Sequence, residues 1–163
     1  MTTTDIAKRP GELSVDALER TVGRFLATRS VTALRASLGL VIAGFGSLKF
    51  VPGWSPAEQL VMKAVDGMTF GVVTGTTAVV ATAVLEVFIG LMFLTGRLPR
   101  FTLIITAGWL FGIMSPLVLF SGELFPGGLP TLAAQYILKD IILAAAVAVV
   151  GAVSLGARFI RTR

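Results

Sequence analysis

Residues 71–94 read GVVTGTTAVVATAVLEVFIGLMFL, and this stretch decides the class of fold. Its one charged residue is Glu86. A helix that crosses a membrane needs about 20 consecutive, mostly apolar residues to match the thickness of the hydrocarbon layer. The stretch therefore predicts a membrane-spanning helix, and Glu86 is a carboxyl group that this helix carries into the membrane.

Three further stretches of the chain have the same apolar character. They are residues 31–51, 101–121 and 132–157. In the whole chain of 163 residues, 55% are apolar and 14% are charged. A soluble domain carries roughly 25% charged residues. The sequence thus predicts an all-α protein, a compact bundle of four transmembrane helices embedded in a lipid bilayer.

The predicted membrane domain covers residues 31–157. An N-terminal segment, residues 1–30, precedes it, and a basic tail, residues 158–163, follows it. No cleavable signal peptide is expected, because the first 34 residues are polar and lack a short apolar core before a small-residue cleavage site.

Two short helices are expected at the membrane surfaces. Residues 14–26 place an apolar set on one helical face, with Arg20 and Arg24 elsewhere, which predicts a basic amphipathic helix at the cytoplasmic surface. That apolar set is Leu18, Val22, Phe25 and Leu26. Between the first two spans, Ser55, Pro56 and Glu58 form the pattern of a capping box, which predicts a short helix on the outer face.

Lysine and arginine residues are concentrated in three segments that flank the spans. A four-span topology would place these three segments on one side of the membrane. The other two loops hold few cations and the acids Glu58, Asp66 and Glu123. Cytoplasmic loops carry the excess of basic residues, so both termini and the turn at residues 95–100 are predicted to face the cytoplasm of a bacterial inner membrane. The cations are Lys8, Arg9, Arg20, Arg24, Arg29 and Arg35, then Arg97 and Arg100, then Arg158, Arg161 and Arg163.

Polar and small residues share one face of each predicted span. Small residues mark close contact between helices in membranes, and charged side chains turn away from lipid. Both rules select the same faces, which predicts a polar bundle interior formed by Arg35, Lys49, Glu86, Lys139 and Asp140. The faces carry Arg35, Gly39, Gly46 and Lys49; Gly75, Thr82, Glu86 and Gly90; Gly108, Gly112 and Ser115; and Tyr136, Asp140, Ala144, Gly151 and Ser154.

Depth along the helices predicts which of these charged groups meet. At a rise of roughly 1.5 Å per residue, Arg35 reaches Glu86, and Lys49 reaches towards Asp140. Lys139 lies about 100° around its helix from Asp140, so that extending outward is the alternative for this side chain. Three cations then face two carboxylates, and the uncompensated cation would attract an anionic or electron-rich headgroup. The alternative is that buried ion pairs fix helix register and stability.

Three further residues are candidates for lining a ligand site. Trp109 and Tyr136 have rings that would stack on a quinone-like ring; the alternatives are a core position for Trp109 and an interfacial anchor for Tyr136. Pro116 is expected to kink the third span, and the carbonyl freed near Ser115 would line a cavity. A kink that serves packing is the alternative there.

The composition excludes several kinds of chemistry. The chain has no cysteine and no histidine, which excludes disulfides, thiol redox chemistry, iron–sulfur ligation and histidine-ligated haem or zinc within it. No metal site is expected, and any redox role requires a diffusible cofactor or a partner. The net charge of +5 does not indicate nucleic-acid binding, because the basic residues are scattered around the spans.

Four segments together resemble the spans of DoxX-like membrane proteins, most closely the YkgB branch, which is linked to reactive-chlorine resistance in bacteria. The family's arginine, Leu-Lys-Phe, glutamate and Lys-Asp positions fall on Arg35, residues 48–50, Glu86, Lys139 and Asp140. The resemblance implies a four-helix membrane bundle. The segments are LRASLGLVIAGFGSLKFVPG at residues 34–53, LEVFIGLMFL at 85–94, MSPLVLF at 114–120 and YILKDIILAAA at 136–146.

The resemblance implies a function as well, because related proteins include a membrane subunit of thiosulfate:quinone oxidoreductase and membrane partners of oxidative-stress enzymes. We expect the membrane component of a redox or stress-response system that binds a quinone or similar amphiphile. It would be at most one subunit of a quinone-linked enzyme, with an oxidoreductase or a second copy of the chain as partner. The alternatives are a small solute transporter or channel, and a scaffold that docks partners through its basic N-terminal helix.

Overall fold

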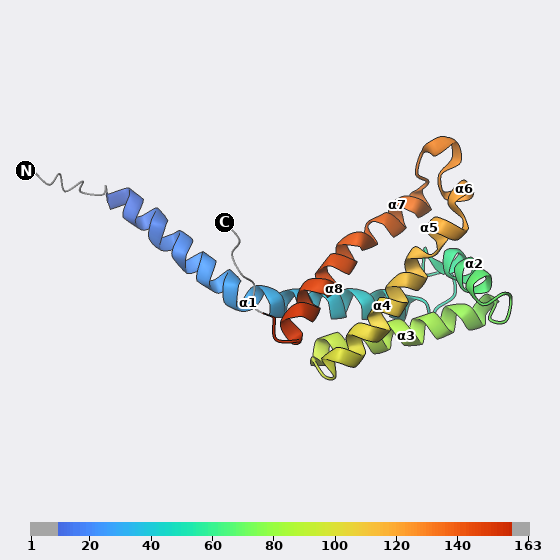
Figure 1. The fold of residues 1–163 in the computed structure, drawn as a ribbon, viewed down its shortest axis with the longest axis horizontal. Coiled ribbons are helices and arrows are strands. Elements are labelled where there is room, and N and C mark those ends of the chain that lie inside the picture. The colour runs from blue at the N-terminus through green and yellow to red at the C-terminus, as the bar shows by residue number, and fades with distance from the viewer. Residues whose placement is uncertain (1–9, 158–163) are drawn as a thin grey trace, which may run out of the picture.

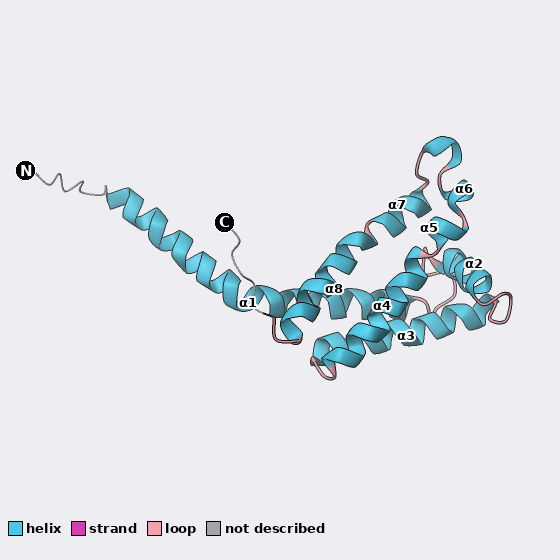
Figure 2. Cartoon of the chain, viewed as in Figure 1, coloured by secondary structure: helices cyan, strands magenta, loops and turns pink. Residues whose placement is uncertain are grey.

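The computed structural model describes residues 10–157 and the side chains of residues 15–157. The predicted basic tail at 158–163, and the cations Lys8 and Arg9, lie outside the described residues. Figure 2 shows helices and loops throughout the described part, so the all-α prediction is confirmed. The helices are α1 (Pro10–Leu48), α2 (Glu58–Met68), α3 (Gly75–Thr95), α4 (Pro99–Met114), α5 (Pro116–Leu119), α6 (Ser121–Leu124), the 3-10 turn η1 (Pro126–Gly128), α7 (Leu132–Leu138) and α8 (Asp140–Ser154).

Four helical segments are long and apolar enough to cross a membrane. They run over Val15–Leu48, Gly75–Thr95, Pro99–Leu119 and Leu132–Ser154. Each contains one of the four predicted spans or most of it. The fold is therefore that of a multi-pass membrane protein.

Helix α1 is much longer than the predicted first span. It continues through residues 30 and 31, where the N-terminal segment and the membrane domain were expected to meet. At 39 residues it measures roughly 58 Å, against a hydrocarbon layer of about 30 Å. Figure 1 shows its N-terminal half projecting away from the other helices. The predicted helix at 14–26 therefore exists as the first part of α1, and its place on the membrane surface stays a prediction.

Helices α1 and α3 pack against each other through the small residues that the sequence singled out. A Cβ atom added to Gly46 would lie 2.7 Å from Glu86 Cβ, and one added to Gly90 would lie 2.6 Å from the backbone N of Ala43. One added to Gly39 would lie 2.7 Å from the carbonyl oxygen of Gly90. The missing side chains allow the two backbones to approach closely, so the predicted contact face between these spans is confirmed.

The apolar core joins these two helices to α4 and α8. Gly151 of α8 provides a further close approach, because a Cβ there would lie 2.7 Å from Leu103 Cδ2 of α4. This core stabilises the end of the bundle at which the α3–α4 turn lies. Its buried members are Leu38, Ile42, Ile89, Phe93, Trp109, Leu110, Val147 and Val150.

The short helix predicted between the first two spans is present as α2, but its predicted capping box is wrong. Helix α2 begins at Glu58, and no side chain caps its N-terminus. The Glu58 carboxylate instead accepts a hydrogen bond of 2.8 Å from the Gly53 backbone N–H. The Glu58 side chain thus caps the preceding turn, and the helix starts two residues later than the Ser55 pattern indicates.

Two of the predicted spans are interrupted within the structure. Pro116 ends α4, as expected, because proline has no N–H to donate to Gly112 four residues earlier. The fourth span is divided at Lys139 into α7 and α8. This second break was not predicted, since no proline or glycine lies there.

Candidate functional site

A cavity of about 550 Å³ lies between α1, α2, α3, α4, α7 and α8. Its volume falls in the range of known small-molecule sites, which is roughly 300–1,000 Å³. Most of its wall is apolar, and its polar side chains come from all four spans. Those polar residues are Lys49, Thr82, Glu86, Trp109, Tyr136, Lys139 and Asp140.

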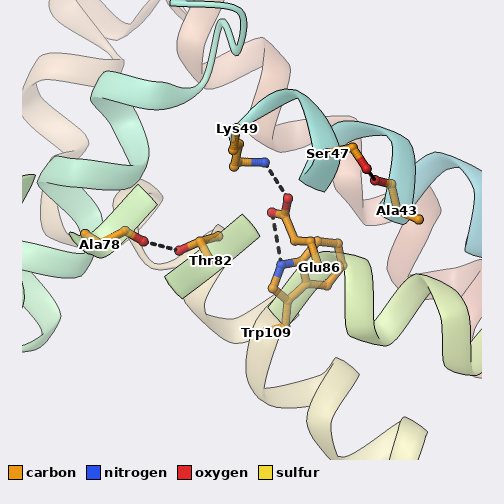
Figure 3. A network of polar contacts seen from close by, with 7 residues as sticks. All are labelled: Ala43, Ser47, Lys49, Ala78, Thr82, Glu86 and Trp109. Atoms are coloured by element: carbon orange, nitrogen blue, oxygen red, sulfur yellow. Dashed lines mark hydrogen bonds and ion pairs between the residues drawn. The ribbon is translucent and has the colours of Figure 1, made fainter. Parts of the chain in front are cut away.

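Glu86 is the centre of the polar network in this wall. Lys49 Nζ lies 2.5 Å from Glu86 Oε2, and Trp109 Nε1–H donates a 3.2 Å hydrogen bond to Glu86 Oε1 (Figure 3). All three residues are buried. The network joins the end of α1, the middle of α3 and the middle of α4, and both carboxylate oxygens of Glu86 have partners.

A second polar group in the wall comes from α7 and α8. The Lys139 ammonium lies 3.5 Å from the centre of the Tyr136 ring and 5.8 Å from that of Phe45. It thus faces aromatic rings at the cavity, and the alternative of an outward extension is wrong. Asp140 lines the cavity beside them, and its carboxylate forms no hydrogen bond or ion pair among the described residues.

The predicted pairing of Arg35 with Glu86 is wrong. Arg35 lies at the other end of the bundle, against Gly96 at the C-terminus of α3, and does not line the cavity. Lys49 takes its place beside Glu86. The reason is geometric: Gly46 brings the end of α1 directly over Glu86, which puts the lysine side chain within reach.

Two other sequence expectations about the site also need correction. Lys49 forms its ion pair with Glu86 and none with Asp140 among the described residues. Ser115 does not line the cavity. Its hydroxyl donates a 2.7 Å hydrogen bond to the Gly112 carbonyl, which also accepts a 3.3 Å hydrogen bond from the Ser115 backbone N–H. Trp109 and Tyr136 do line it.

The charges around the cavity balance. Lys49 and Lys139 carry two positive charges, and Glu86 and Asp140 carry two negative ones, giving a formal sum of zero. The expectation of an excess cation in the interior counted Arg35, which lies elsewhere. A neutral molecule with polar groups therefore suits this wall better than an anion does.

Sequence reasoning missed the part that α2 plays in the site. Its apolar face supplies one side of the cavity. The sequence did contain a signal for this role. Apolar residues in and just before α2 recur at intervals of three and four, which indicates a helix with one apolar face that packs against a partner. These residues are Ala57, Leu60, Val61, Ala64, Val65 and Met68.

The small residues of α4 also have a different use from the predicted one. Gly108 has no atom within 4 Å of an added Cβ, and Gly112 has one contact, Met68 Cε at 3.7 Å. Both glycines line the cavity instead of a close helix contact. Their missing side chains leave the space that a ligand would fill.

Comparison of the chain with models of protein families, with curated proteins and with solved structures finds no match. The resemblance to DoxX-like proteins therefore stays a prediction. The function has to be argued from the cavity and its chemistry.

Proposed function

We propose that the protein binds a quinone or a similar neutral amphiphile in the cavity, as the membrane component of a bacterial redox or stress-response system. The observation that carries this proposal is the composition of the cavity wall. Apolar residues form most of it, and a charge-balanced polar group lies at membrane depth. Such a wall matches a molecule with a polar, uncharged head and an apolar body.

The polar residues offer hydrogen bonds that suit quinone carbonyl oxygens. The Lys49 ammonium has three N–H donors, and Glu86 accepts one of them. The ammonium of Lys139 and the hydroxyl of Tyr136 donate no hydrogen bond among the described residues. Asp140, with its unused acceptor oxygens, suits the hydroxyl groups of the reduced, quinol form.

The apolar part of the ligand has a route towards the lipid. Phe111 lines the cavity and is 76% exposed, and Val41 lines it and is 47% exposed. Exposed apolar side chains on a transmembrane helix face the hydrocarbon of the bilayer. An isoprenoid or alkyl tail would extend past these residues into the membrane.

Electron transfer in this proposal needs a second protein. The chain has neither cysteine nor histidine, so it holds no thiol couple and no histidine-ligated metal of its own. The electrons would come from or go to an oxidoreductase bound at the membrane surface. Gentle purification that recovers such an enzyme would support this part of the proposal. Quinone reduction or oxidation that depends on this chain in cells lacking any such enzyme would contradict it.

Tryptophan fluorescence tests ligand binding directly, because the chain has two tryptophans and Trp54 is not among the residues of the cavity wall. In the Trp54→Phe variant, reconstituted in nanodiscs, a short-tailed quinone should quench Trp109 fluorescence with saturation. A fatty alcohol of equal tail length should not. Quenching that rises linearly with quinone concentration would indicate simple partition into lipid and would contradict the proposal.

The matched control is Trp109→Phe, which leaves Trp54 as the reporter. Trp54 is 64% exposed, so its fluorescence should show linear quenching alone. Lys139→Met and Asp140→Asn then test the headgroup side of the cavity. Each should raise the half-saturating quinone concentration without changing the linear component.

A further inference from the structure

A small recess at the other end of the bundle brings two arginines together. It has a volume of about 20 Å³, room for about one water molecule, and lies where α1, the α3–α4 turn and the end of α8 meet. Arg35 and Arg97 line it, with Gly96, Thr102 and Ser154. Arg35 stands 14 residues before Lys49 in α1, roughly 21 Å away along the helix.

Arg35 is held in place by the shape of the turn. Gly96 ends α3 in the left-handed conformation, with φ of 66°. A Cβ atom on Gly96 would lie 1.9 Å from Arg35 Nη1, so glycine alone leaves room for the guanidinium. The half-buried arginine thus packs against the end of α3 and keeps its side chain at the recess.

These two cations have no carboxylate partner within residues 15–157. Arg35 and Arg97 form no ion pair among the described residues. No aspartate or glutamate occurs at residues 20–57, at residues 87–122 or after Asp140, and these ranges contain every segment that meets at the recess. A guanidinium that is partly withdrawn from water without an anion is costly, and phosphate is its common partner.

We propose that Arg35 and Arg97 bind the phosphate of an anionic phospholipid in the adjacent leaflet. The recess lies at the end of three spans, which is the level of lipid headgroups. Basic recesses between transmembrane helices on the cytoplasmic side bind anionic headgroups. Leu98 and Leu155, which are 64% and 57% exposed beside the turn and the end of α8, provide apolar surface for the acyl chains.

Native mass spectrometry of the detergent-purified chain tests this proposal. Phosphatidylglycerol, phosphatidylcholine and inorganic phosphate are added separately, and the fraction of protein with one bound molecule is measured. Phosphatidylglycerol should remain bound at concentrations where phosphatidylcholine does not. Arg35→Gln and Arg97→Gln should each weaken its binding about fivefold, which corresponds to ~1 kcal/mol per arginine near a membrane surface.

Arg24→Gln is the matched control, because Arg24 is exposed on the projecting part of α1 and carries the same charge. An equal loss in this variant would show diffuse attraction and overturn the site. Displacement of phosphatidylglycerol by millimolar inorganic phosphate would identify a free-anion site instead. If Arg35→Gln fails to fold, the test rests on Arg97→Gln, because Arg97 is exposed and its replacement should not disturb folding. Unchanged lipid binding in Arg97→Gln would overturn the proposal.

Discussion

Lys49 and Glu86 form a buried ion pair between the end of α1 and the middle of α3, with their side chains 6% and 5% exposed. Trp109 of α4 hydrogen-bonds to the second carboxylate oxygen. Three of the four membrane-spanning segments are thus joined at one carboxylate. Because this carboxylate also faces the cavity, the same contacts hold the bundle together and shape the site.

Removing one member of this pair should destabilise the protein strongly. Glu86→Gln and Lys49→Gln should each cost roughly 3–5 kcal/mol, because each leaves a buried charge without a partner. The double variant should recover much of that loss, since neither charge then remains. Unfolding in mixed detergent measures the three free energies, and losses that simply add would contradict the pairing.

Two control cycles separate this pair from its alternatives. Lys63 and Glu123 also form an ion pair, but their side chains are 47% and 66% exposed, so that cycle should give a coupling of about 0–1 kcal/mol. Arg35→Gln should show no coupling with Glu86→Gln, because Arg35 lies against Gly96. Strong coupling between Arg35→Gln and Glu86→Gln would instead support the Arg35–Glu86 pairing that the sequence predicted.

The hydrogen bond from Trp109 should contribute measurably to stability. Trp109→Phe keeps an aromatic ring but removes the 3.2 Å hydrogen bond to Glu86. Hydrogen bonds to charged groups contribute roughly 1.5–3 kcal/mol, so the variant should unfold more easily by about that amount. In a Glu86→Gln background the loss should shrink towards that of a neutral hydrogen bond. An unchanged loss would mean that ring packing, not the carboxylate contact, matters.

The close contact between α1 and α3 should not tolerate a methyl group. Gly46→Ala would place a Cβ 2.7 Å from Glu86 Cβ, and forcing the helices apart should cost about 1–3 kcal/mol. Gly44→Ala, two residues away, meets no atom within 4 Å and should be neutral or slightly stabilising. Melting temperatures of the two variants in one detergent give the comparison, and equal values would argue against close packing at Gly46.

The orientation in the membrane remains a prediction from charge, and cysteine labelling measures it. The chain has no natural cysteine. Leu98, Val72 and Leu129 are exposed in three different connections. With an impermeant thiol reagent on intact bacteria, Val72→Cys and Leu129→Cys should be labelled and Leu98→Cys should be silent. Labelling of Leu98→Cys alone would invert the topology.

The sequence predicted the four spans because their length and apolar composition are local properties. It also placed Gly46, Gly90 and Glu86 on inward faces, because helical periodicity fixes which residues share a side. Both results required only the geometry of a single helix. The break at Lys139 could not be predicted, since no proline or glycine lies there. The length of α1 was missed although Pro10, at its first position, is a residue that favours helix starts.

The pairing inside the site depends on how the helices are placed, which depth along each span does not determine. Helical spacing put Arg35 and Lys49 on the same predicted face, and depth alone allowed Arg35 to reach Glu86. The close contact at Gly46 determines which cation pairs with Glu86, because it brings Lys49 over the Glu86 carboxylate. The role of α2 was missed for a different reason: a helix predicted outside the spans was not considered as part of their interior.

Photoaffinity labelling with an azidoquinone tests the central proposal most directly. After illumination in nanodiscs, mass spectrometry of peptides identifies the labelled residues. Labels should concentrate on cavity residues from separate helices, such as Met68, Trp109 and Tyr136, and an excess of unmodified quinone should abolish them. Labels spread over the lipid-exposed surface, at positions such as Ile104 and Ile142, and unaffected by competing quinone would contradict a quinone site in this cavity.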